Sequence, residues 1–397
     1  MSPIELVEEI PGLYGSLKVE EQTIQKIWHE QNFNSFGLTT ECGARLEISS
    51  PGIWNKAEEG PDFKNAKIIL NGKKINGDIE IHFQAQDWCN HGHHEESNYE
   101  KVILHVTLFP VGSQKYQCKT KKGKVVPQLV LLPRLAQSLE EILEKQVIES
   151  LAGYDSVLPP SFQSSQVLHE IREKNHSLAQ KRWVQKKNFA RKRLLSVSDP
   201  KQALHECFLE VLGYKRNRSQ MARVSQLFPI NEWSSNKVEP REALDSIHNW
   251  KMRGIRPANH PQLRLQQYHQ LWEKNPLWCE SLLAMNIKDS ENAKITNRKR
   301  LKLSNLNREW KEEILRGVWA GTRVNTLWID ACLPILAEIH QRDYFATWFH
   351  WYAGDFPRSL YEIARKAKIA GHSYKIPFSN GSLQGILGYC IENHILE

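Results

Sequence analysis

The sequence predicts an α/β domain over residues 1–150 followed by an all-α, basic domain over residues 151–397. Its length exceeds the roughly 100–200 residues of one ordinary domain. Short β-type runs fill the first 133 residues, and the pattern becomes helical after Pro133. Charge divides in the same way, because residues 1–150 carry 16 Lys and Arg against 21 Asp and Glu, and the rest carry 37 against 24.

The first domain is expected to have the element order αβββαβ. A helix is predicted over residues 19–31, where Glu21, Ile24 and Trp28 recur on one face. Asn71-Gly72 is the typical turn of a β-hairpin and separates the second and third strand-like runs. The polar residues 84–99 would form a loop or short helix before the fourth run. The runs are 44–49, 65–70, 77–83, 101–109 and 125–132.

The second domain is expected to be helical throughout. Residues 135–151 are amphipathic, Pro159-Pro160 indicates a connector, and a long basic helix is predicted over residues 168–195. Helical periods continue from Ala203 to Ile391, and the domain boundary is expected within 150–165.

Composition favours a cytoplasmic protein with no membrane segment. Hydrophobic residues make up 40% and charged residues 25%, as in soluble globular chains. The first nine residues contain no Lys or Arg, and the apolar runs are shorter than the roughly 18 residues of a membrane span. Seven dispersed cysteines without a CxxC pair argue against a disulfide framework or a Cys-rich zinc site.

Polar and apolar side chains alternate along residues 78–83, so the two sets face opposite sides of a strand. The polar set is Asp78, Glu80 and His82. Two carboxylates on one strand face repel each other when both are ionised, unless solvent or a cation offsets their charge. The alternative is an ordinary exposed sheet face.

Further candidate ligands surround this strand in sequence. Asp62 lies 18 residues before Glu80, across the predicted hairpin, and Asp87 follows it. Five of the 16 histidines fall within residues 82–105: His82, His91, His93, His94 and His105. Carboxylates suit Mg²⁺ or Mn²⁺, and clustered imidazoles suit Zn²⁺, Mn²⁺ or Fe²⁺. The alternatives are a turn cap for Asp62, a helix N-cap for Asp87, surface positions for the loop histidines and a core position for His105.

Pro61-Asp62 and Glu80-Ile81-His82, placed in the order αβββαβ, resemble the core of the PD-(D/E)xK nuclease superfamily. That resemblance implies two carboxylates beside a scissile phosphate and hydrolysis that depends on a divalent metal. His82 stands where the superfamily pattern has lysine.

The runs GPDFKNAKI, NGDIEIH, DWCNHGH and NYEKVILHV resemble an uncharacterised bacterial family known as a domain of unknown function. Gly213-Tyr214-Lys215-x-Asn217 and residues 256–261 (RPANHP) with Arg264 resemble later motifs of that family. Asp78 stands where the family more often has Asn, so it is not assigned as a ligand. The family carries no established activity.

The hypothesis for the first domain is a metal-dependent site for phosphodiester hydrolysis. Asp62 and Glu80 would hold the ion, Glu21 would complete its shell, and His82 would act as general base or orient the water. His91 or His93 would donate to the leaving oxygen. The catalytic residues are therefore predicted as Asp62, Glu80, His82 and His91, and the metal ligands as Glu21, Asp62, Glu80, Asp87 and His93.

The long helix of the second domain is predicted to bind nucleic acid. Residues 172–193 contain nine Lys and Arg against one acid, interleaved with Trp183 and Phe189. The alternative is a solvated helix face. The predicted contacts are Lys181, Arg182, Lys186, Lys187, Arg191, Lys192 and Arg193.

The sequence thus favours a nuclease-like enzyme that uses Mg²⁺ or Mn²⁺, with Zn²⁺ as a further candidate. Two alternatives remain open: a nucleic-acid- or protein-binding protein with a structural metal site, and a metallohydrolase of small phosphoesters. P-loop, dinucleotide-binding and nucleophile-elbow motifs do not occur, which disfavours nucleotide hydrolysis, dinucleotide redox chemistry and serine acyl transfer.

Overall fold

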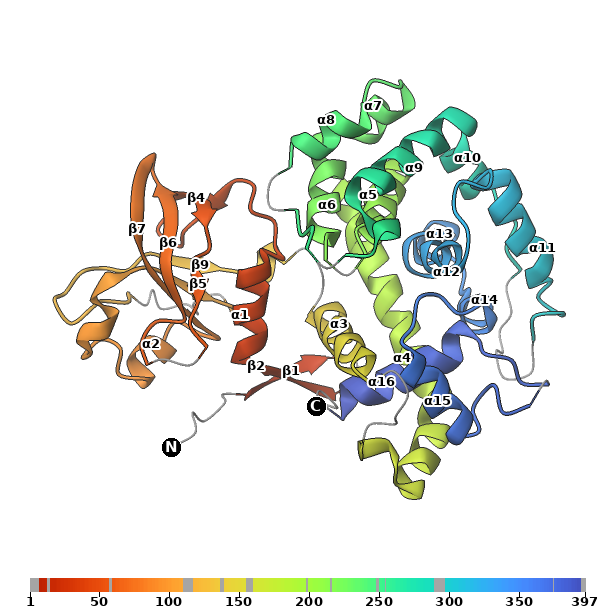
Figure 1. The fold of residues 1–397 in the computed structure, drawn as a ribbon, viewed down its shortest axis with the longest axis horizontal. Helices are drawn as coiled ribbons and strands as arrows, with labels where there is room; N and C mark the ends of the chain where they lie inside the picture. Colours follow the sequence, from red (N-terminus) through yellow and green to blue (C-terminus); the bar gives the residue numbers. More distant parts are fainter. Residues whose placement is uncertain are drawn as a thin grey trace. The chain divides into compact units, whose positions relative to one another are not determined.

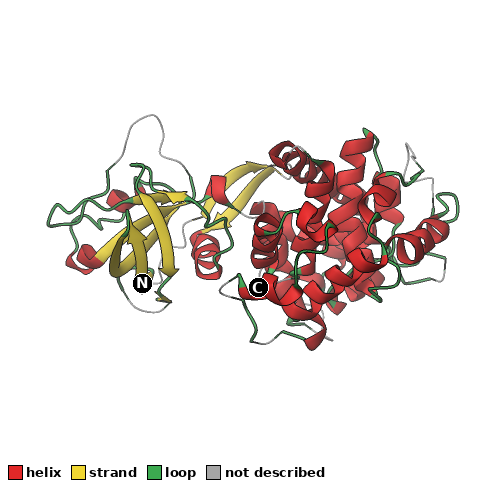
Figure 2. Ribbon diagram, turned by 90° about the horizontal axis from the view of Figure 1, so that it is seen from above, coloured by secondary structure: helices red, strands yellow, loops and turns green. Residues whose placement is uncertain are grey.

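A computed structural model describes residues 7–12, 15–56, 59–109, 117–135, 139–154, 160–197, 199–214, 216–247, 250–253, 255–288, 297–373 and 375–393. The chain forms two compact units, Met1–Leu139 and Glu140–Glu397. Every strand of these described ranges belongs to the first unit, and helices fill the second (Figure 2). The predicted change from a sheet-rich region to a helical one is therefore confirmed. None of the described helices combines the length and apolar composition that a membrane span requires.

One mixed sheet forms the first unit. Strand order is β3-β4-β6-β7-β8-β9, and β5 pairs with β6 (Figure 1). Pairing is antiparallel from β3 to β7 and parallel from β7 to β9. The strands are β3 (Leu38–Thr39), β4 (Arg45–Ser50), β5 (Ile53–Trp54), β6 (Phe63–Leu70), β7 (Lys73–His82), β8 (Val102–Thr107) and β9 (Gln128–Val130), and β1 (Val7–Gly12) and β2 (Gly15–Glu20) form a separate hairpin.

The β6–β7 hairpin has the predicted turn. Asn71 and Gly72 both have positive φ, 48° and 82°, as a two-residue turn that matches strand twist requires. Near the open end of the hairpin, the register shifts between Phe63 and Ala66. Asp78 Oδ1 accepts a hydrogen bond from Asn65 N there, at 3.0 Å, so its carboxylate has a structural partner.

A helix, α1 (Glu21–Glu30), packs against β7 through its apolar face. Ile24, Ile27 and Trp28 are buried, and each such side chain contributes about 1.5–3 kcal/mol when fully removed from water. This packing places Glu21, in the first helical turn, on the sheet. The polar segment between β7 and β8 contains α2 (Asp87–Asn90) and the 3₁₀ helix η1 (Ser97–Lys101).

The last predicted strand is shorter in the structure than in the sequence interpretation. Residues 125–132 were expected to be extended, but only β9 pairs as a strand. Pro127 precedes it, and the 3₁₀ helix η2 (Leu132–Arg134) follows, with Pro133 inside it. Proline lacks a backbone N–H and therefore limits the ladder on both sides.

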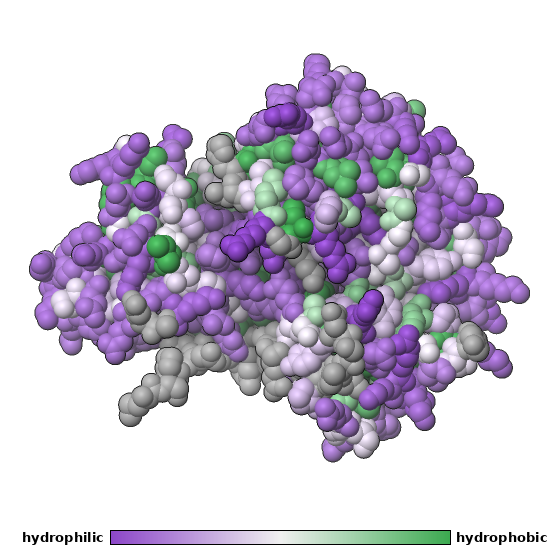
Figure 3. Space-filling view, in the orientation of Figure 1, coloured by the Kyte–Doolittle hydropathy of each residue, from purple (hydrophilic) through white to green (hydrophobic). Residues whose placement is uncertain are grey.

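The second unit is built around the long helix α4 (Ser165–Val197), which packs along α16 (Asn380–Glu392) (Figure 1). Gly385 permits this approach, since a Cβ there would lie 2.3 Å from Asn175 O. Hydrophilic residues cover most of the visible surface of this unit, and hydrophobic ones form small patches (Figure 3).

The remaining described helices of the second unit include four short 3₁₀ or π segments among α-helices. They are α3 (Leu139–Ala152), η3 (Pro160–Phe162), α5 (Pro200–Leu212), α6 (Arg218–Leu227), α7 (Ile230–Ser234), α8 (Pro240–Asp245), η4 (Pro257–Asn259), α9 (Pro261–Lys274), α10 (Trp278–Leu283), α11 (Leu303–Arg308), the π-helix η5 (Glu309–Ile314), α12 (Thr322–Thr326), the π-helix η6 (Leu327–Cys332), α13 (Leu333–His340), α14 (Phe345–His350) and α15 (Arg358–Lys366).

Candidate metal centre

Two carboxylates meet at the open end of the β6–β7 hairpin. Asp62 directly precedes β6, and Glu80 lies near the end of β7. Asp62 N donates to Glu80 Oε2 at 3.1 Å, and Ile81 N donates to Asp62 Oδ2 at 2.9 Å. Gln25 of α1 donates from Nε2 to Asp62 Oδ1 at 2.7 Å. The hairpin and the helix thus fix both carboxylates.

Three histidines approach the other side of Glu80. His93 Nε2 and His82 Nε2 lie 3.2 and 3.5 Å from Glu80 Oε1, yet neither nitrogen has a hydrogen bond with proper alignment. The His91 ring centre is 4.7 Å from that of His82. Ligand atoms of His82, His91 and His93 all lie within 4.8 Å of one another. Nitrogen atoms that converge without hydrogen bonds are what a metal site offers.

Burial makes the acidic side of this cluster hard to ionise. It raises the pKa of Asp62 well above the usual range, and the neighbouring Glu80 adds to the effect. Burial also raises the pKa of Glu80, with a contribution from Glu21. The pKa of Glu21 is raised to about 8 by burial and by Asp62 and Asp87, and its Oε2 has no hydrogen-bond partner. A cation would relieve all three carboxylates.

The imidazole side is held in the neutral form. Burial lowers the pKa of His82 well below its usual range, lowers that of His91, and lowers that of His93 to about 4. Neutral imidazole keeps a lone pair, which is the form that binds a metal or accepts a proton. At neutral pH the cluster therefore presents nitrogen donors rather than positive charges.

A buried hydrogen-bond chain fixes the orientation of His82. His82 Nδ1 and His105 Nε2 are 2.8 Å apart, and His105 Nδ1 lies 3.1 Å from Cys118 Sγ. Gln128 Nε2 donates to this sulfur at 2.8 Å, and the thiol donates to Ala85 O at 3.7 Å. Because the thiol proton is directed to Ala85, His105 Nδ1 must donate to sulfur and His105 Nε2 must accept from His82 Nδ1. His82 Nε2 then carries the lone pair that faces Glu80.

Aromatic residues fix the third histidine. His93 stacks on Tyr99 with ring centres 3.8 Å apart, and Trp88 meets His93 edge-on at 5.6 Å. Trp88 is itself anchored, since its Nε1 donates to Lys119 O at 2.9 Å. Trp88 and Tyr99 are both buried.

The structure brings most predicted site residues together: Glu21, Asp62, Glu80, His82, His91 and His93. Asp87 differs, because its carboxylate accepts hydrogen bonds from Gln84 N, just before α2, at 2.9 Å and from Asn90 Nδ2 of α2 at 3.2 Å. It acts on the cluster through its charge near Glu21. His94 lies beside Glu95, with Nε2 3.5 Å from Oε1.

Sequence reasoning missed the residues that position the cluster. Gln25 lies one helical turn after Glu21, a spacing that contained a signal for a shared face. Cys118 and Gln128 reach His105 only through the fold, so no local pattern indicated them. His105 was left between a ligand and a core histidine, and it is a buried, hydrogen-bonded partner of a candidate ligand.

The seven cations predicted to bind nucleic acid lie on α4, and six of them pair with acids of the second unit. Arg182, Lys186 and Arg193 are buried or nearly so in these pairs. The six pairs are Lys181–Glu392, Arg182–Glu144, Lys186–Asp330, Lys187–Asp343, Arg191–Glu338, and Arg193 with Glu206 and Glu210. Lys192 is exposed. The buried members stabilise the unit, and contact with nucleic acid stays a prediction for the exposed ones.

A divalent cation fits the donor set of the first unit. The three histidines His82, His91 and His93 offer closely spaced nitrogen donors, and Glu80 Oε1 lies within 3.5 Å of two of them. Asp62 contacts Glu80 through its backbone N, and its charge acts on Glu21. Mixed carboxylate and imidazole ligation suits Mn²⁺ or Zn²⁺ better than Mg²⁺, which prefers oxygen ligands alone.

A family described as "Protein of unknown function (DUF2851)" matches residues 21–244, which span the sheet, the metal-site candidates and much of α3 to α8. No curated protein and no solved structure matches the chain.

Proposed function

The chain belongs to the DUF2851 family, and we propose that it is a divalent-metal-dependent phosphodiesterase of the nuclease type, with nucleic acid as its substrate. One observation carries the proposal: one oxygen of Glu80 accepts a hydrogen bond from Asp62 N, and the other oxygen faces two imidazole nitrogens. Glu80 is buried, and its second oxygen and two imidazole nitrogens face one another at the end of a hairpin. The helix that covers the hairpin adds Glu21. Such an arrangement can hold a cation.

The element order supports the same reaction class. The chain runs through α1, the antiparallel strands β4, β6 and β7 and the parallel strand β8, with shorter elements between them. Asp62 before β6 and Glu80 on β7 support the comparison with the PD-(D/E)xK pattern. His82 replaces the lysine of that pattern. Its orientation by His105 gives it a lone pair on Nε2, so it would take the proton that lysine handles in the resembling enzymes.

Each residue then has a distinct task. Asp62, Glu80, Glu21 and His93 would hold the cation. A bound divalent cation would lower the pKa of a water molecule and offset charge on the phosphate. His82 Nε2 would accept the proton of the attacking water, and the half-buried His91 would donate a hydrogen bond to the leaving oxygen.

The test is cleavage of plasmid DNA and of a structured RNA by the purified full chain with Mn²⁺, Mg²⁺ or Zn²⁺. We expect cleavage that EDTA abolishes and that Asp62→Asn or Glu80→Gln lowers by about a hundredfold or more. Asp78→Asn is the matched control, because Asp78 lies on the same strand and its Oδ1 accepts from Asn65 N outside the cluster. Equal cleavage by wild type, D62N and E80Q would refute the proposal.

A second candidate is a structural metal site, and the closely spaced triad His82, His91 and His93 favours it. In that case purified protein would contain one zinc per chain, cleave neither nucleic acid, and lose thermal stability on chelation. Turnover of a small phosphoester such as bis(p-nitrophenyl) phosphate without nucleic-acid cleavage would instead identify a small-molecule metallohydrolase.

A further inference from the structure

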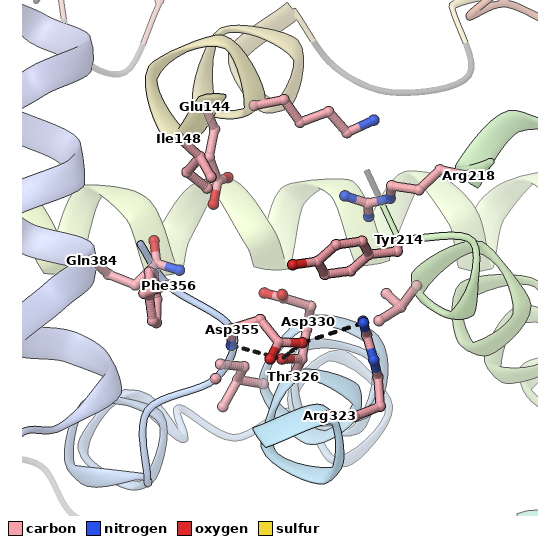
Figure 4. A pocket seen from close by; sticks show the side chains of 14 residues that line it. Glu144, Ile148, Tyr214, Arg218, Arg323, Thr326, Asp330, Asp355, Phe356 and Gln384 are labelled. Atoms are coloured by element: carbon pink, nitrogen blue, oxygen red, sulfur yellow. Dashed lines mark hydrogen bonds and ion pairs between the residues drawn. The ribbon is translucent and has the colours of Figure 1, made fainter. Parts of the chain in front are cut away.

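The helical unit contains a cavity of about 90 Å³ whose lining includes no residue of the metal centre. It lies between α3, the start of α6, the run α12–η6, the segment after Gly354, and α16 (Figure 4). This volume accommodates several water molecules or one group of phosphate size. Its charged or hydroxylated lining includes Glu144, Tyr214, Arg218, Arg323, Asp330 and Asp355.

Arg323 contributes an incompletely satisfied guanidinium to the wall. The residue is only 7% exposed. Its Nη2 donates to Asn259 Oδ1 at 3.1 Å and lies 3.4 Å from Asp355 Oδ2. Its Nε and Nη1 have no hydrogen-bond partner among the described residues. Buried polar groups normally have partners, so these N–H groups point to an acceptor that the protein itself does not supply.

A second buried guanidinium shares a hydrogen-bond acceptor with the first. Arg264 is 6% exposed and donates only to neutral amide oxygens, Asn259 Oδ1 at 2.9 Å and Gln267 Oε1 at 2.8 Å. Burial and the charge of Arg323 lower the pKa of Arg264 to about 10. Both cations thus share Asn259, and Asp355 is the acid that faces them, which leaves positive charge in excess.

The other acids of the wall are already paired with different cations. Glu144 pairs with Arg182, and Asp330 Oδ1 lies 2.7 Å from Lys186 Nζ. Asp355 is fixed by Thr326, whose hydroxyl accepts from Asp355 N at 3.0 Å. Asp355 and Asp330, which is shared with Lys186, therefore offset only part of the positive charge of Arg264, Arg323 and Lys186.

The backbone of this wall is strained at Tyr214. Tyr214 has φ of 54°, in the left-handed region, where a bulky side chain is unfavourable. The Arg323 guanidinium carbon lies 4.3 Å from the centre of the Tyr214 ring, and the ring hydroxyl is directed toward Asp330 and Asp355 (Figure 4). Gly213 before it has no room for a side chain, because a Cβ would lie 2.3 Å from Asn217 O.

Two sequence motifs that the metal centre does not use converge here. Tyr214 and Asn217 belong to the motif at residues 213–217, and Asn259 and Arg264 belong to residues 256–264. Asn217 fixes the segment that precedes the second motif, because its Oδ1 accepts a hydrogen bond from Lys251 N at 2.8 Å. Asn259 joins both arginines. These contacts give the two motifs one common location.

We propose that this cavity binds a terminal phosphate group, either of inorganic phosphate or of a phosphate monoester. Phosphate carries up to two negative charges and several acceptor oxygens, which match the open N–H groups of Arg323 and the excess positive charge. The group would come from free phosphate, from a mononucleotide, or from the 5′ end of a nucleic-acid strand. This site is separate from the metal centre and does not depend on the proposed hydrolysis.

The test is isothermal titration of the full chain in EDTA, so that binding is measured without turnover. The probes are orthophosphate, AMP, and a short oligothymidylate with or without a 5′ phosphate. We expect a phosphate-bearing probe to bind, and Arg323→Gln to weaken it by about ten- to a hundredfold. Arg241→Gln is the control, because Arg241 is 85% exposed and pairs only across one helical turn with Asp245. The tightest probe identifies the source of the phosphate.

A measurement on wild type covers the case in which R323Q does not fold. The tightest-binding probe should slow hydrogen exchange in α12 and in the first turn of α6, which line the cavity, and leave α8 unchanged. The proposal is overturned if none of the phosphate probes binds wild type. It is equally overturned if R323Q and R241Q bind alike, or if protection falls elsewhere.

Discussion

Replacement of His105 by phenylalanine should slow the proposed cleavage although His105 has no direct task in the reaction. His105 is fully buried, and its two ring nitrogens contact His82 Nδ1 and Cys118 Sγ. Burial and the neighbouring histidines lower its pKa to about 3, so the substitution removes no charge at neutral pH. Phenylalanine keeps the ring volume and removes only the hydrogen bonds.

The expected size follows from the two bonds that are lost. His82 Nδ1–H becomes a buried donor without an acceptor, which costs about 1–3 kcal/mol of folding free energy. His82 then also loses the preference for the lone pair on Nε2 that the proposed proton transfer needs, and loss of such an outer partner lowers activity by about 10–100-fold. Thermal denaturation measures the first effect, and the rate of cleavage at saturating Mn²⁺ measures the second.

The difference in stability between wild type and H105F should also depend on pH. A histidine whose folded pKa is about 3 contributes stability that is complete above its unfolded pKa and is lost as pH falls through the range 6.5 to 3. The stability gap between wild type and H105F should therefore narrow as pH falls below about 6.5. His94→Gln is the control, because His94 lies beside Glu95 outside the chain of hydrogen bonds. If H105F cleaves nucleic acid as fast as wild type, the orienting role of His105 is refuted.

Three further predictions concern packing and titration. Gly77→Ala should destabilise the sheet by about 2 kcal/mol or more, because its Cβ would lie 2.4 Å from Lys101 O; an unchanged melting temperature would contradict this. Arg182 lowers the pKa of Glu144 to about 2 against burial, so its stabilisation is present above about pH 4.5 and is lost as pH falls toward 2. Acid denaturation curves of wild type and Glu144→Gln should accordingly converge near pH 2, and a constant gap would be the wrong outcome. Mn²⁺ affinity should rise from pH 6 to about 9, because Glu21, with a pKa of about 8, must lose its proton; calorimetry in buffers of different ionisation enthalpy counts the protons released, and a flat profile would contradict the site.

Local pattern was sufficient to predict the elements that hold the site. Asn71-Gly72 predicted the hairpin, and the turn adopts the two positive φ values that these residues favour. Alternation along residues 78–83 separated Ile79 and Ile81 from Glu80 and His82, which do point to different faces. The pattern did not show that both faces are buried there, because covering segments come from α1 and from residues 87–101.

Long-range pairing was beyond the reach of sequence. The charge run on α4 predicted a face for a polyanion, whereas Arg182, Lys186 and Arg193 meet acids that lie up to 144 residues away. Ion pairs between distant positions leave no periodic signal. The same holds for the cavity of the helical unit. Tyr214 and Asn259 belong to sequence motifs, but no local pattern indicated Arg323, which contacts both of them.

The central claim is that Glu80 joins carboxylates and imidazoles around one divalent cation. Mn²⁺ binding, measured by electron paramagnetic resonance on wild type, Glu80→Gln and Asp78→Asn, tests it most directly. The account predicts one Mn²⁺ per chain in wild type and D78N, and at least about a hundredfold weaker binding in E80Q. Equal Mn²⁺ affinity in E80Q and D78N would contradict it.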